Sequence, residues 1–219
     1  MIELFNIDCM DKMKEYPDKW FDLAIVDPPY GIHENGNRDL VPKGAACARK
    51  KYNDALWLQD APTDEYFSEL FRVSQNQIIW GGNYFNLGPT RCYVFWDKRG
   101  TCPGNDFADG ELGWTSFNTS LRKFTHLWNG MLQEDMSNKE SRIHPTQKPV
   151  KLYEWLLKNY AKPGDKILDT HRGSMSSAIA CYNLDYDLVL MEIDKDYFES
   201  GKARLEEHKK QGRLFNVHP

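Results

Sequence analysis

The apolar residues of this chain are concentrated in short runs, and four of these runs stop directly at an acidic residue. The acids that end the four runs are Asp8, Asp27, Asp169 and Glu192. Apolar runs of this length with little polar alternation are typical of strands buried on both faces of a parallel sheet. Because ligands bind beyond the carboxyl ends of such strands, we expect the four carboxylates to surround one cleft. A single acid at such a position is more often a helix cap or turn residue, an explanation that is difficult to extend to all four.

Helical periodicity appears between the predicted strands. Residues 63–71, 150–160 and 196–210 carry apolar side chains at three-to-four spacing, and the last of these helices is expected to end before Gly212. Further strands are expected at residues 77–80, 92–96, 112–116 and 123–127. Alternating strands and helices predict an α/β fold with a doubly wound, mainly parallel sheet. We expect this sheet to have seven strands and to form a single domain over residues 1–219.

Composition is that of an ordinary globular protein and excludes several other classes. Of the 219 residues, 41% are hydrophobic, and no stretch approaches the roughly 18 apolar residues that a membrane span requires. The first residues lack the basic region and cleavage site of a signal peptide. The five cysteines are scattered without a C-x-x-C pair, so neither a zinc site nor a disulfide framework is predicted and a cytoplasmic location is expected. The net charge of −4 argues weakly against a nonspecific polyanion binder.

One segment is basic against this acidic background. Its cationic residues are Arg38, Lys43, Arg49, Lys50 and Lys51. We expect these side chains to grip DNA phosphates, and a solvated loop is the alternative. Residues 31–60 and 97–146 are accordingly interpreted as DNA-contacting and target-recognition loops within the domain, and residues 128–146 are expected to be mostly loop.

The segment Asp27-Pro28-Pro29-Tyr30 follows the second predicted strand directly. Two prolines remove two backbone donors and fix two φ angles, so the carbonyl groups between them point in set directions. The Asp27 carboxylate, a proline carbonyl and the plane of Tyr30 then form a rigid set of acceptors beside an aromatic ring. This arrangement suits an exocyclic amino group with two N–H donors on a ring that stacks on the tyrosine. The alternative is a stiff turn without chemistry.

With this motif the chain resembles the S-adenosylmethionine-dependent amino-methyltransferases of DNA, in the permuted order called the beta class and in their phage-type members. In that order the D-P-P-Y half precedes the cofactor half. The other segments that carry the resemblance are residues 6–9, 78–85, 95–98, 107–114 and the sequence H-P-T-Q-K-P at residues 144–149. These motifs occur in the family's order and cover nearly the whole chain.

The resemblance implies catalytic roles for the D-P-P-Y residues. Asp27 and the carbonyl of Pro28 would accept hydrogen bonds from N6 of the target adenine, Pro29 would hold the turn, and Tyr30 would stack on the extruded base. No separate strong base is needed, because the amine becomes acidic only as the methyl group arrives. Catalysis would then consist mainly of positioning and electrostatics. Extruding the base from the duplex costs a few kcal/mol, which the pocket must recover.

The resemblance also implies a binding site for the cofactor S-adenosylmethionine. Asp169 would lie near its methionine amino group, Glu192 on its ribose hydroxyls and Asp8 on its adenine amino group, with Thr146 and Lys148 near its carboxylate. The position of Glu192 at the end of the next strand supports the ribose role independently. Lys148 as a solvated surface residue is the alternative for that side chain. The remaining expected cofactor-binding residues are Cys9, Asp27, Thr170, His171, Gly173, Ser174 and Asp194.

The segment after Asp169 departs from the family pattern. The usual Asp-Pro-Phe, one variable residue and Gly-Ser-Gly is replaced by a stretch in which Thr170 and His171 stand for proline and phenylalanine, and Met175 stands for the last glycine. If that glycine needs a positive φ, methionine would weaken cofactor binding; if the residue is already helical, methionine costs nothing, and we expect the helical case. We expect His171 to pack or to contact the cofactor, with a proton carrier as the alternative.

The predicted activity is methylation of adenine N6 in DNA. Aspartate in place of serine or asparagine before Pro-Pro-Tyr favours adenine, by resemblance. The alternatives are methylation of cytosine N4, RNA or a protein amide, and a DNA-binding relic whose cofactor segment has decayed at Met175. No G-x-G-x-x-G follows a predicted strand, which argues against a dinucleotide oxidoreductase. No metal is expected, and the resemblance makes a homodimer plausible.

Overall fold

The computed structural model describes residues 1–31, 61–100, 108–129, 132–171 and 173–215. All five residues predicted to grip DNA, namely Arg38, Lys43, Arg49, Lys50 and Lys51, lie outside the described residues. None of the described helices is both long and apolar enough to span a bilayer.

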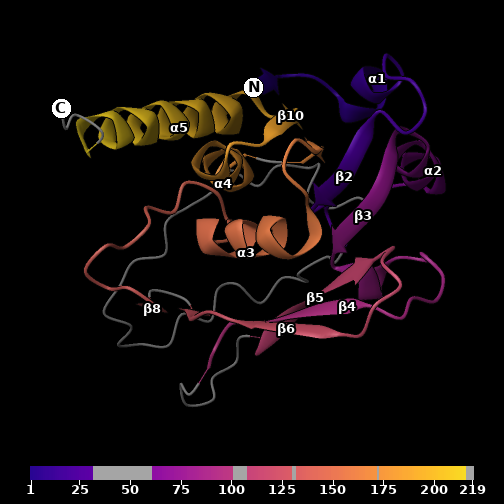
Figure 1. The fold of residues 1–219 in the computed structure, drawn as a ribbon, viewed down its shortest axis with the longest axis horizontal. Coiled ribbons are helices and arrows are strands. Elements are labelled where there is room, and N and C mark those ends of the chain that lie inside the picture. Colours follow the sequence, from indigo (N-terminus) through magenta and orange to yellow (C-terminus); the bar gives the residue numbers. More distant parts are fainter. Residues whose placement is uncertain (32–60, 101–107, 130–131, 172, 216–219) are drawn as a thin grey trace.

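An eight-stranded sheet in the order β1-β10-β9-β2-β3-β5-β4-β6 forms the centre of the described structure (Figure 1). Its strands are β1 (Ile2–Phe5), β2 (Phe21–Val26), β3 (Ser74–Trp80), β4 (Tyr93–Asp97), β5 (Gly110–Thr115), β6 (Arg122–Thr125), β9 (Lys166–Asp169) and β10 (Asp187–Met191). The five strands from β1 to β3 are parallel, β5 is antiparallel to both neighbours, and β6 is parallel to β4. The predicted α/β class with a mainly parallel sheet is therefore confirmed. The sheet has eight strands and not the expected seven; the outermost, β6, overlaps the strand expected at residues 123–127.

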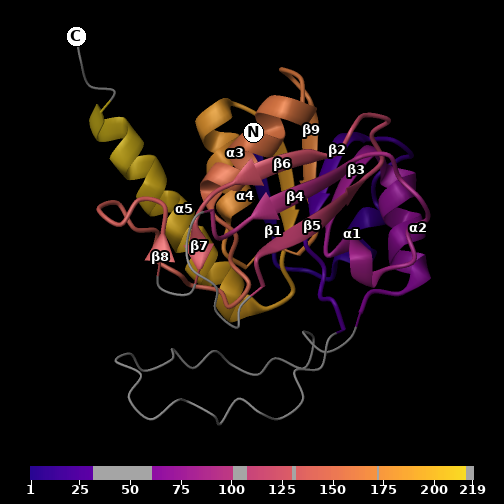
Figure 2. The same ribbon diagram turned by 90° about the horizontal axis from the view of Figure 1, so that it is seen from below.

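Helices cover both faces of this sheet (Figure 1 and Figure 2). They are α1 (Cys9–Met13), α2 (Asp64–Val73), α3 (Val150–Tyr160), α4 (Ser176–Leu184) and α5 (Lys195–Phe215). Alternate residues of β2 belong to two apolar cores, one on each face of the sheet. Leu23 and Ile25 pack in one apolar core with side chains of α3, α4 and α5, whereas Ala24 and Val26 pack in another with α1 and α2. The strand is buried on both faces, as its unbroken apolar run predicts.

Several predicted boundaries differ from the structure. The first strand ends at Phe5, before Asp8, because the Asp8 carboxylate accepts a hydrogen bond from the backbone N–H of Met10 and caps α1. Helix α5 continues through Gly212 to Phe215. The expected loop over residues 128–146 contains two short paired strands, β7 (Trp128–Asn129) and β8 (Leu132–Gln133).

Met175 is not helical, so that expectation is wrong. It precedes α4 with a φ of 56°, in the left-handed region that favours glycine. Its side chain is fully buried in the core between the sheet and α4, close to Gly201 of α5. A left-handed backbone costs a residue with a Cβ about 1 kcal/mol or more. Burial of the thioether chain offsets this cost, since a buried methionine contributes about 2 to 5 kcal/mol relative to alanine.

The positive φ of Met175 predicts an unusual order of stability among its variants. Met175→Ala and Met175→Gly both lose the buried side chain, but only glycine relieves the positive φ. We expect Met175→Gly to be more stable than Met175→Ala by about 1 kcal/mol, measured by urea unfolding. Ala178→Gly, inside α4, is the control and should show the usual destabilisation by glycine of about 1 kcal/mol. Met175→Gly less stable than Met175→Ala would contradict the left-handed conformation.

Candidate functional site

The strand order reverses between β2 and β9, which are parallel neighbours although they are far apart in the chain. Leu23 pairs with Ile167 and Ala24 with Leu168, and from this point the chain proceeds to β3 on one side and to β10 on the other. Ligands of doubly wound sheets bind at such a switch point, beyond the carboxyl ends of the strands. A cavity of about 630 Å³ lies at this point and is lined by residues that follow β1, β2, β9 and β10. This volume is within the range of small-molecule sites.

Three of the four acids that end the apolar runs line the cavity. They are Asp8, Asp27 and Glu192. Asp169 is fully buried and is not among the described lining residues; its carboxylate accepts hydrogen bonds from Ser177 Oγ at 2.6 Å and from the backbone N–H of His171 at 3.4 Å. The four carboxylates thus converge on one region, three at its surface and one below it.

The described lining of the cavity is acidic. It includes the three carboxylates and no lysine or arginine. Burial lowers the pKa of His171 to about 4 and raises the pKa of Cys9, with help from the Asp8 carboxylate, to about 12. Both of these lining side chains are therefore uncharged at neutral pH, and the cavity suits a cationic ligand.

Asp169 is a fully buried carboxyl group that accepts hydrogen bonds from Ser177 and His171. Burial raises its pKa to about 8, and the nearby carboxylates of Asp27 and Glu192 act in the same direction. At neutral pH the free protein therefore holds a proton on Asp169, and a positively charged ligand nearby would favour its release.

His171 forms part of the cavity wall. Its Nδ1 lies 2.9 Å from Thr170 Oγ1 and 3.5 Å from the hydroxyl of Tyr66, which itself lies 2.7 Å from Thr170 Oγ1. This network connects α2 to the end of β9. With its low pKa, His171 is a poor proton carrier, which favours the expected packing or contact role.

The D-P-P-Y residues line the cavity with the tyrosine ring held in place. The hydroxyl of Tyr30 donates to Asp27 Oδ1 at 2.8 Å, and its ring is stacked with that of Tyr84, with centroids 5.1 Å apart. Gly81 has a φ of 68°, and a Cβ there would lie 2.2 Å from the ring of Tyr30. Only glycine allows this close approach, and glycine adopts this left-handed conformation without strain.

Lys148 is a buried lysine paired with carboxylates. It is 2% exposed, so the alternative of a solvated lysine is wrong. It is also absent from the described cavity lining; its ammonium lies 2.6 Å from Asp27 Oδ1 and 2.9 Å from Glu111 Oε2. In the structure this ammonium is thus paired with the catalytic candidate Asp27, and its expected place near the cofactor carboxylate stays a prediction.

The other predicted cofactor residues fall into two groups. Thr146 and Thr170 line the cavity. Gly173, Ser174 and Asp194 support its walls without being among the described lining residues. A Cβ on Gly173 would lie 2.6 Å from His144, the Ser174 carbonyl accepts from Arg204, and Asp194 accepts from the first backbone N–H groups of α5.

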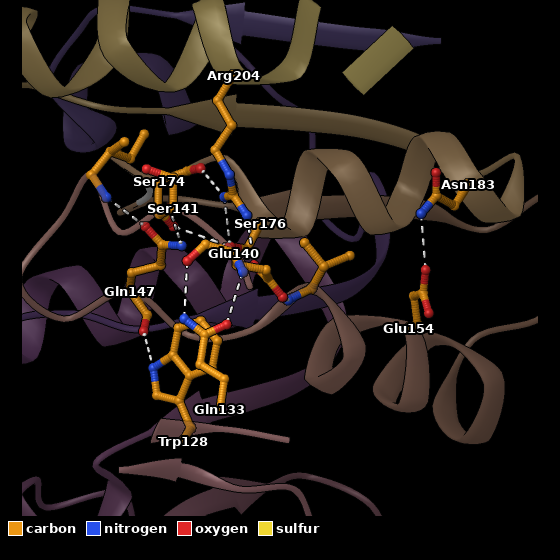
Figure 3. Close-up of polar contacts among 12 residues, drawn as sticks. Trp128, Gln133, Glu140, Ser141, Gln147, Glu154, Ser174, Ser176, Asn183 and Arg204 are labelled. Atoms are coloured by element: carbon orange, nitrogen blue, oxygen red, sulfur yellow. Dashed lines mark hydrogen bonds and ion pairs between the residues drawn. The ribbon is translucent and has the colours of Figure 1, made fainter. Parts of the chain in front are cut away.

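The segment that carries Thr146 and Lys148 is held by buried polar contacts (Figure 3). Arg204 of α5 donates to the carbonyl of Ser174 at 2.5 Å and to Glu140 Oε2 at 2.7 Å. Glu140 also accepts from the backbone N–H of Val150, at the start of α3. The indole of Trp128 donates to the carbonyl of Gln147 at 3.0 Å. These contacts fix the segment against α3, α5 and the turn before α4.

Sequence reasoning missed Tyr66, His144, Glu111 and Arg204 as site residues. Tyr66 was assigned to the apolar face of its helix, and His144 and Glu111 lie inside motifs that carry the family resemblance. A charged residue directly before a predicted strand is the one signal that could have indicated Glu111. The role of Arg204 depends on contacts with residues distant in the chain, for which no local pattern exists.

The raised pKa of Asp169 predicts a pH dependence of folding. Between pH 4 and 8 the folded protein retains a proton on Asp169 that the unfolded chain has lost, so this residue makes the protein less stable as pH rises. Asp169→Asn mimics the protonated side chain. We expect its stability advantage over the wild type to be larger at pH 8.5 than at pH 5.5 by at least about 1 kcal/mol, measured by urea unfolding. Asp11→Asn, at an exposed site, is the control, and an advantage independent of pH would refute the assignment.

Comparison with known proteins finds similarity to DNA methylases. A family described as DNA methylase matches residues 89–203. The type II methyltransferase M2.DpnII of Streptococcus pneumoniae is 24% identical over 207 residues, which cover 92% of this chain and 70% of that protein. The type II methyltransferase M.HpaI of Haemophilus parainfluenzae is 25% identical over 232 residues, covering 89% and 71% respectively.

Solved structures share the fold at lower identity. The M1.HpyAVI–SAM complex has a TM-score of 0.58 at 20% identity, covering 93% of this chain and all of that one. The cytosine-N4-specific PvuII DNA methyltransferase has a TM-score of 0.58 at 13% identity, covering 99% and 93%. The family match extends over more than half of the chain, and the D-P-P-Y segment and the cofactor-half segment meet at one cavity. The chain belongs to the family of N6 and N4 DNA methylases.

Proposed function

We propose that this protein transfers the methyl group of S-adenosylmethionine to the exocyclic N6 amino group of a flipped adenine in DNA. The observation that carries the proposal is the D-P-P-Y segment, all four residues of which line an acidic cavity at the switch point of the sheet. Acceptors aimed at an amino group and a cavity suited to a cation are the two requirements of this reaction.

The cavity fits S-adenosylmethionine by charge. The ligand carries a positive sulfonium and an α-ammonium group, and the described lining offers carboxylates without lysine or arginine. Glu192 would accept from the ribose hydroxyls, Asp8 from the adenine amino group, and Asp169 would lie below the methionine ammonium. M1.HpyAVI and the putative DNA modification methylase TTHA0409 of Thermus thermophilus, which share the fold, were both solved with this ligand. When bound, it supplies an electrophilic methyl group.

The residues of the D-P-P-Y segment would direct the attacking nitrogen. The Asp27 carboxylate and the Pro28 carbonyl would accept the two N–H bonds of the amino group, leaving its lone pair directed at the methyl carbon. As the new N–C bond forms, the C–S bond breaks and its electron pair passes to sulfur. The nitrogen becomes acidic at that stage, and the Asp27 carboxylate is placed to receive the proton. Positioning of this kind accounts for much of the rate in many enzymes.

Tyr30 would provide the stacking surface for the extruded base. Gly81 and Tyr84 hold its ring against the end of β3. Because the ring is fixed before the base arrives, little conformational entropy is lost on stacking. That gain helps to offset the cost of base flipping, which is a few kcal/mol.

Cytosine N4 is the second candidate target. Its amino group also presents two N–H donors, and the cytosine-N4-specific PvuII enzyme shares the fold. Aspartate as the first residue of the D-P-P-Y segment supports adenine. The names of the two type II relatives specify no base.

We further propose that residues 31–60 and 97–146 contact DNA. Gly31 and Ala61, which flank the basic segment, lie against one another, and Ala61 lines the cavity. The segment therefore starts and ends beside the proposed site of base entry, where its lysines and arginines can reach phosphates. Within residues 97–146, Lys98 is paired with Glu111 and Lys123 with Asp97, so we do not expect these two lysines to bind phosphates.

Transfer of tritium-labelled methyl groups to DNA tests the function. We expect digestion of the product to yield labelled N6-methyladenine, and we expect Asp27→Ala to reduce turnover at least about 100-fold while the Kd for S-adenosylmethionine changes less than about threefold. Asp11→Asn is the control for expression and folding. Label on cytosine would establish the second candidate, and full turnover by Asp27→Ala would disprove the acceptor role.

Salt dependence tests the DNA contact. If Lys50 and Lys51 each bind a phosphate, the variant with both changed to alanine should lose about two units of slope in a plot of log K against log salt concentration. Fluorescence anisotropy with a labelled duplex measures this slope. The exposed Lys14→Ala is the matched control. An unchanged slope would assign both lysines to solvent.

A further inference from the structure

Four alternating charges form a cluster directly behind the D-P-P-Y segment. Lys148 Nζ lies 2.6 Å from Asp27 Oδ1 and 2.9 Å from Glu111 Oε2, and Lys98 Nζ lies 2.7 Å from Glu111 Oε1. The four residues come from the end of β2, the segment before α3, β5 and the end of β4. The cluster therefore connects the proposed catalytic carboxylate at the end of β2 to β5 and β4, which lie beyond β3 in the same half of the sheet.

The centre of this cluster is the part most withdrawn from water. The side chains of Lys148 and Asp27 are 3% and 4% exposed, whereas those of Glu111 and Lys98 are each about one-fifth exposed. A charge in such a place is tolerated only when it is paired. The ammonium of Lys148 serves two carboxylates, so its charge is divided between Asp27 and Glu111.

Glu111 shows that this electrostatic coupling is strong. Burial alone would raise the pKa of its carboxyl group, but the ammonium groups of Lys148 and Lys98 outweigh that effect and lower the pKa. Glu111 is consequently a fixed negative charge that competes with Asp27 for Lys148.

We propose that Lys148 and Glu111 are positioning residues for methyl transfer. Lys148 keeps the Asp27 carboxylate ionised and oriented, and Glu111 weakens this effect because it shares the ammonium group of Lys148. This inference rests on the proposed function. An ionised carboxylate only accepts hydrogen bonds, whereas a protonated carboxyl is also a donor. Asp27 can bind an amino group through its N–H bonds only in the ionised form.

The other described groups around Asp27 are neutral or acidic. Tyr30 donates a neutral hydrogen bond to it. The end of β9 contributes His171, whose low pKa keeps it neutral, and Asp169, and α2 contributes Tyr66, whose pKa is raised by burial. Asp169 is the one of these groups whose pKa lies near 8, and it acts on Asp27 as a like charge. Lys148 is thus the described cation that stabilises the Asp27 carboxylate.

The test compares Lys148→Met, Lys148→Arg and the double variant Lys148→Met with Glu111→Gln. Lys151→Met is the matched control, because Lys151 is an exposed lysine paired with Glu154. The first measurement is the ¹³C NMR titration of the Asp27 carboxyl, assigned with Asp27→Asn, in protein without cofactor or DNA. The second is kcat as a function of pH at saturating cofactor and DNA. Asp169 is present in every variant, so differences between variants report on the charge cluster.

We expect Lys148→Met to raise the midpoint of the Asp27 titration by about one to three pH units and to lower kcat at pH 7 by about 10- to 100-fold. The acid limb of kcat should move to higher pH with it, while the KM for cofactor stays within about threefold. In the double variant the like charge of Glu111 is also gone, so the midpoint should move back toward the wild type. Lys148→Arg and Lys151→Met should keep the wild-type profile.

Loss of structure would give another result, because it would lower the rate equally at every pH and would not be reversed by a second substitution. An Asp27 midpoint that is the same in wild type, Lys148→Met and the double variant overturns the inference. So does methylation of DNA by Lys148→Met with a wild-type rate and pH profile, which leaves the proposed function intact. A wild-type protein that methylates no nucleic acid refutes the proposed function, and the NMR titration then still decides how Lys148 acts on Asp27.

Discussion

The parallel contact between β2 and β9 is the constraint on which the site depends. It places the ends of two strands from opposite halves of the chain side by side, so that Asp27 and Asp169 approach the same cavity. Neither half could form this site alone, since one presents acceptors for an amino group and the other presents the acidic wall. The pairing itself rests on ordinary burial of unbroken apolar runs on both faces.

Two buried carboxyl groups of this region differ in pKa for one physical reason. Glu111 and Asp169 are both withdrawn from water, yet the pKa of Glu111 is lowered and that of Asp169 is raised. The difference is the pair of ammonium groups at 2.7 and 2.9 Å from Glu111, which outweighs desolvation. Among the described residues, the cations of this region lie behind the D-P-P-Y segment, and the described lining of the cavity is acidic. A cationic methyl donor and an ionised Asp27 can then be accommodated in one small volume.

The sequence predicted the strands and the convergence of the switch-point acids because these depend on local patterns. Helix α4 was indicated only through the expectation that Met175 is helical, because its first six residues are all buried and it has no apolar stripe to detect. The left-handed conformation of Met175 follows from its packing against α5 rather than from its neighbours in the chain. The ion pair between Lys148 and Glu111 could not be predicted for a similar reason, because the two residues meet only when β5 is paired with β3. The features that could not be predicted are therefore those that depend on packing between distant parts of the chain.

The segment before α3 connects the two sides of the reaction. Thr146 lines the cavity, and Lys148, two residues later, contacts Asp27. Because Arg204 ties this segment to the turn before α4 through Glu140 and Ser174, the position of Lys148 beside Asp27 and the position of Thr146 in the cavity wall are fixed by the same packing. Such contacts among packed groups favour discrete arrangements of these side chains over continuous ones.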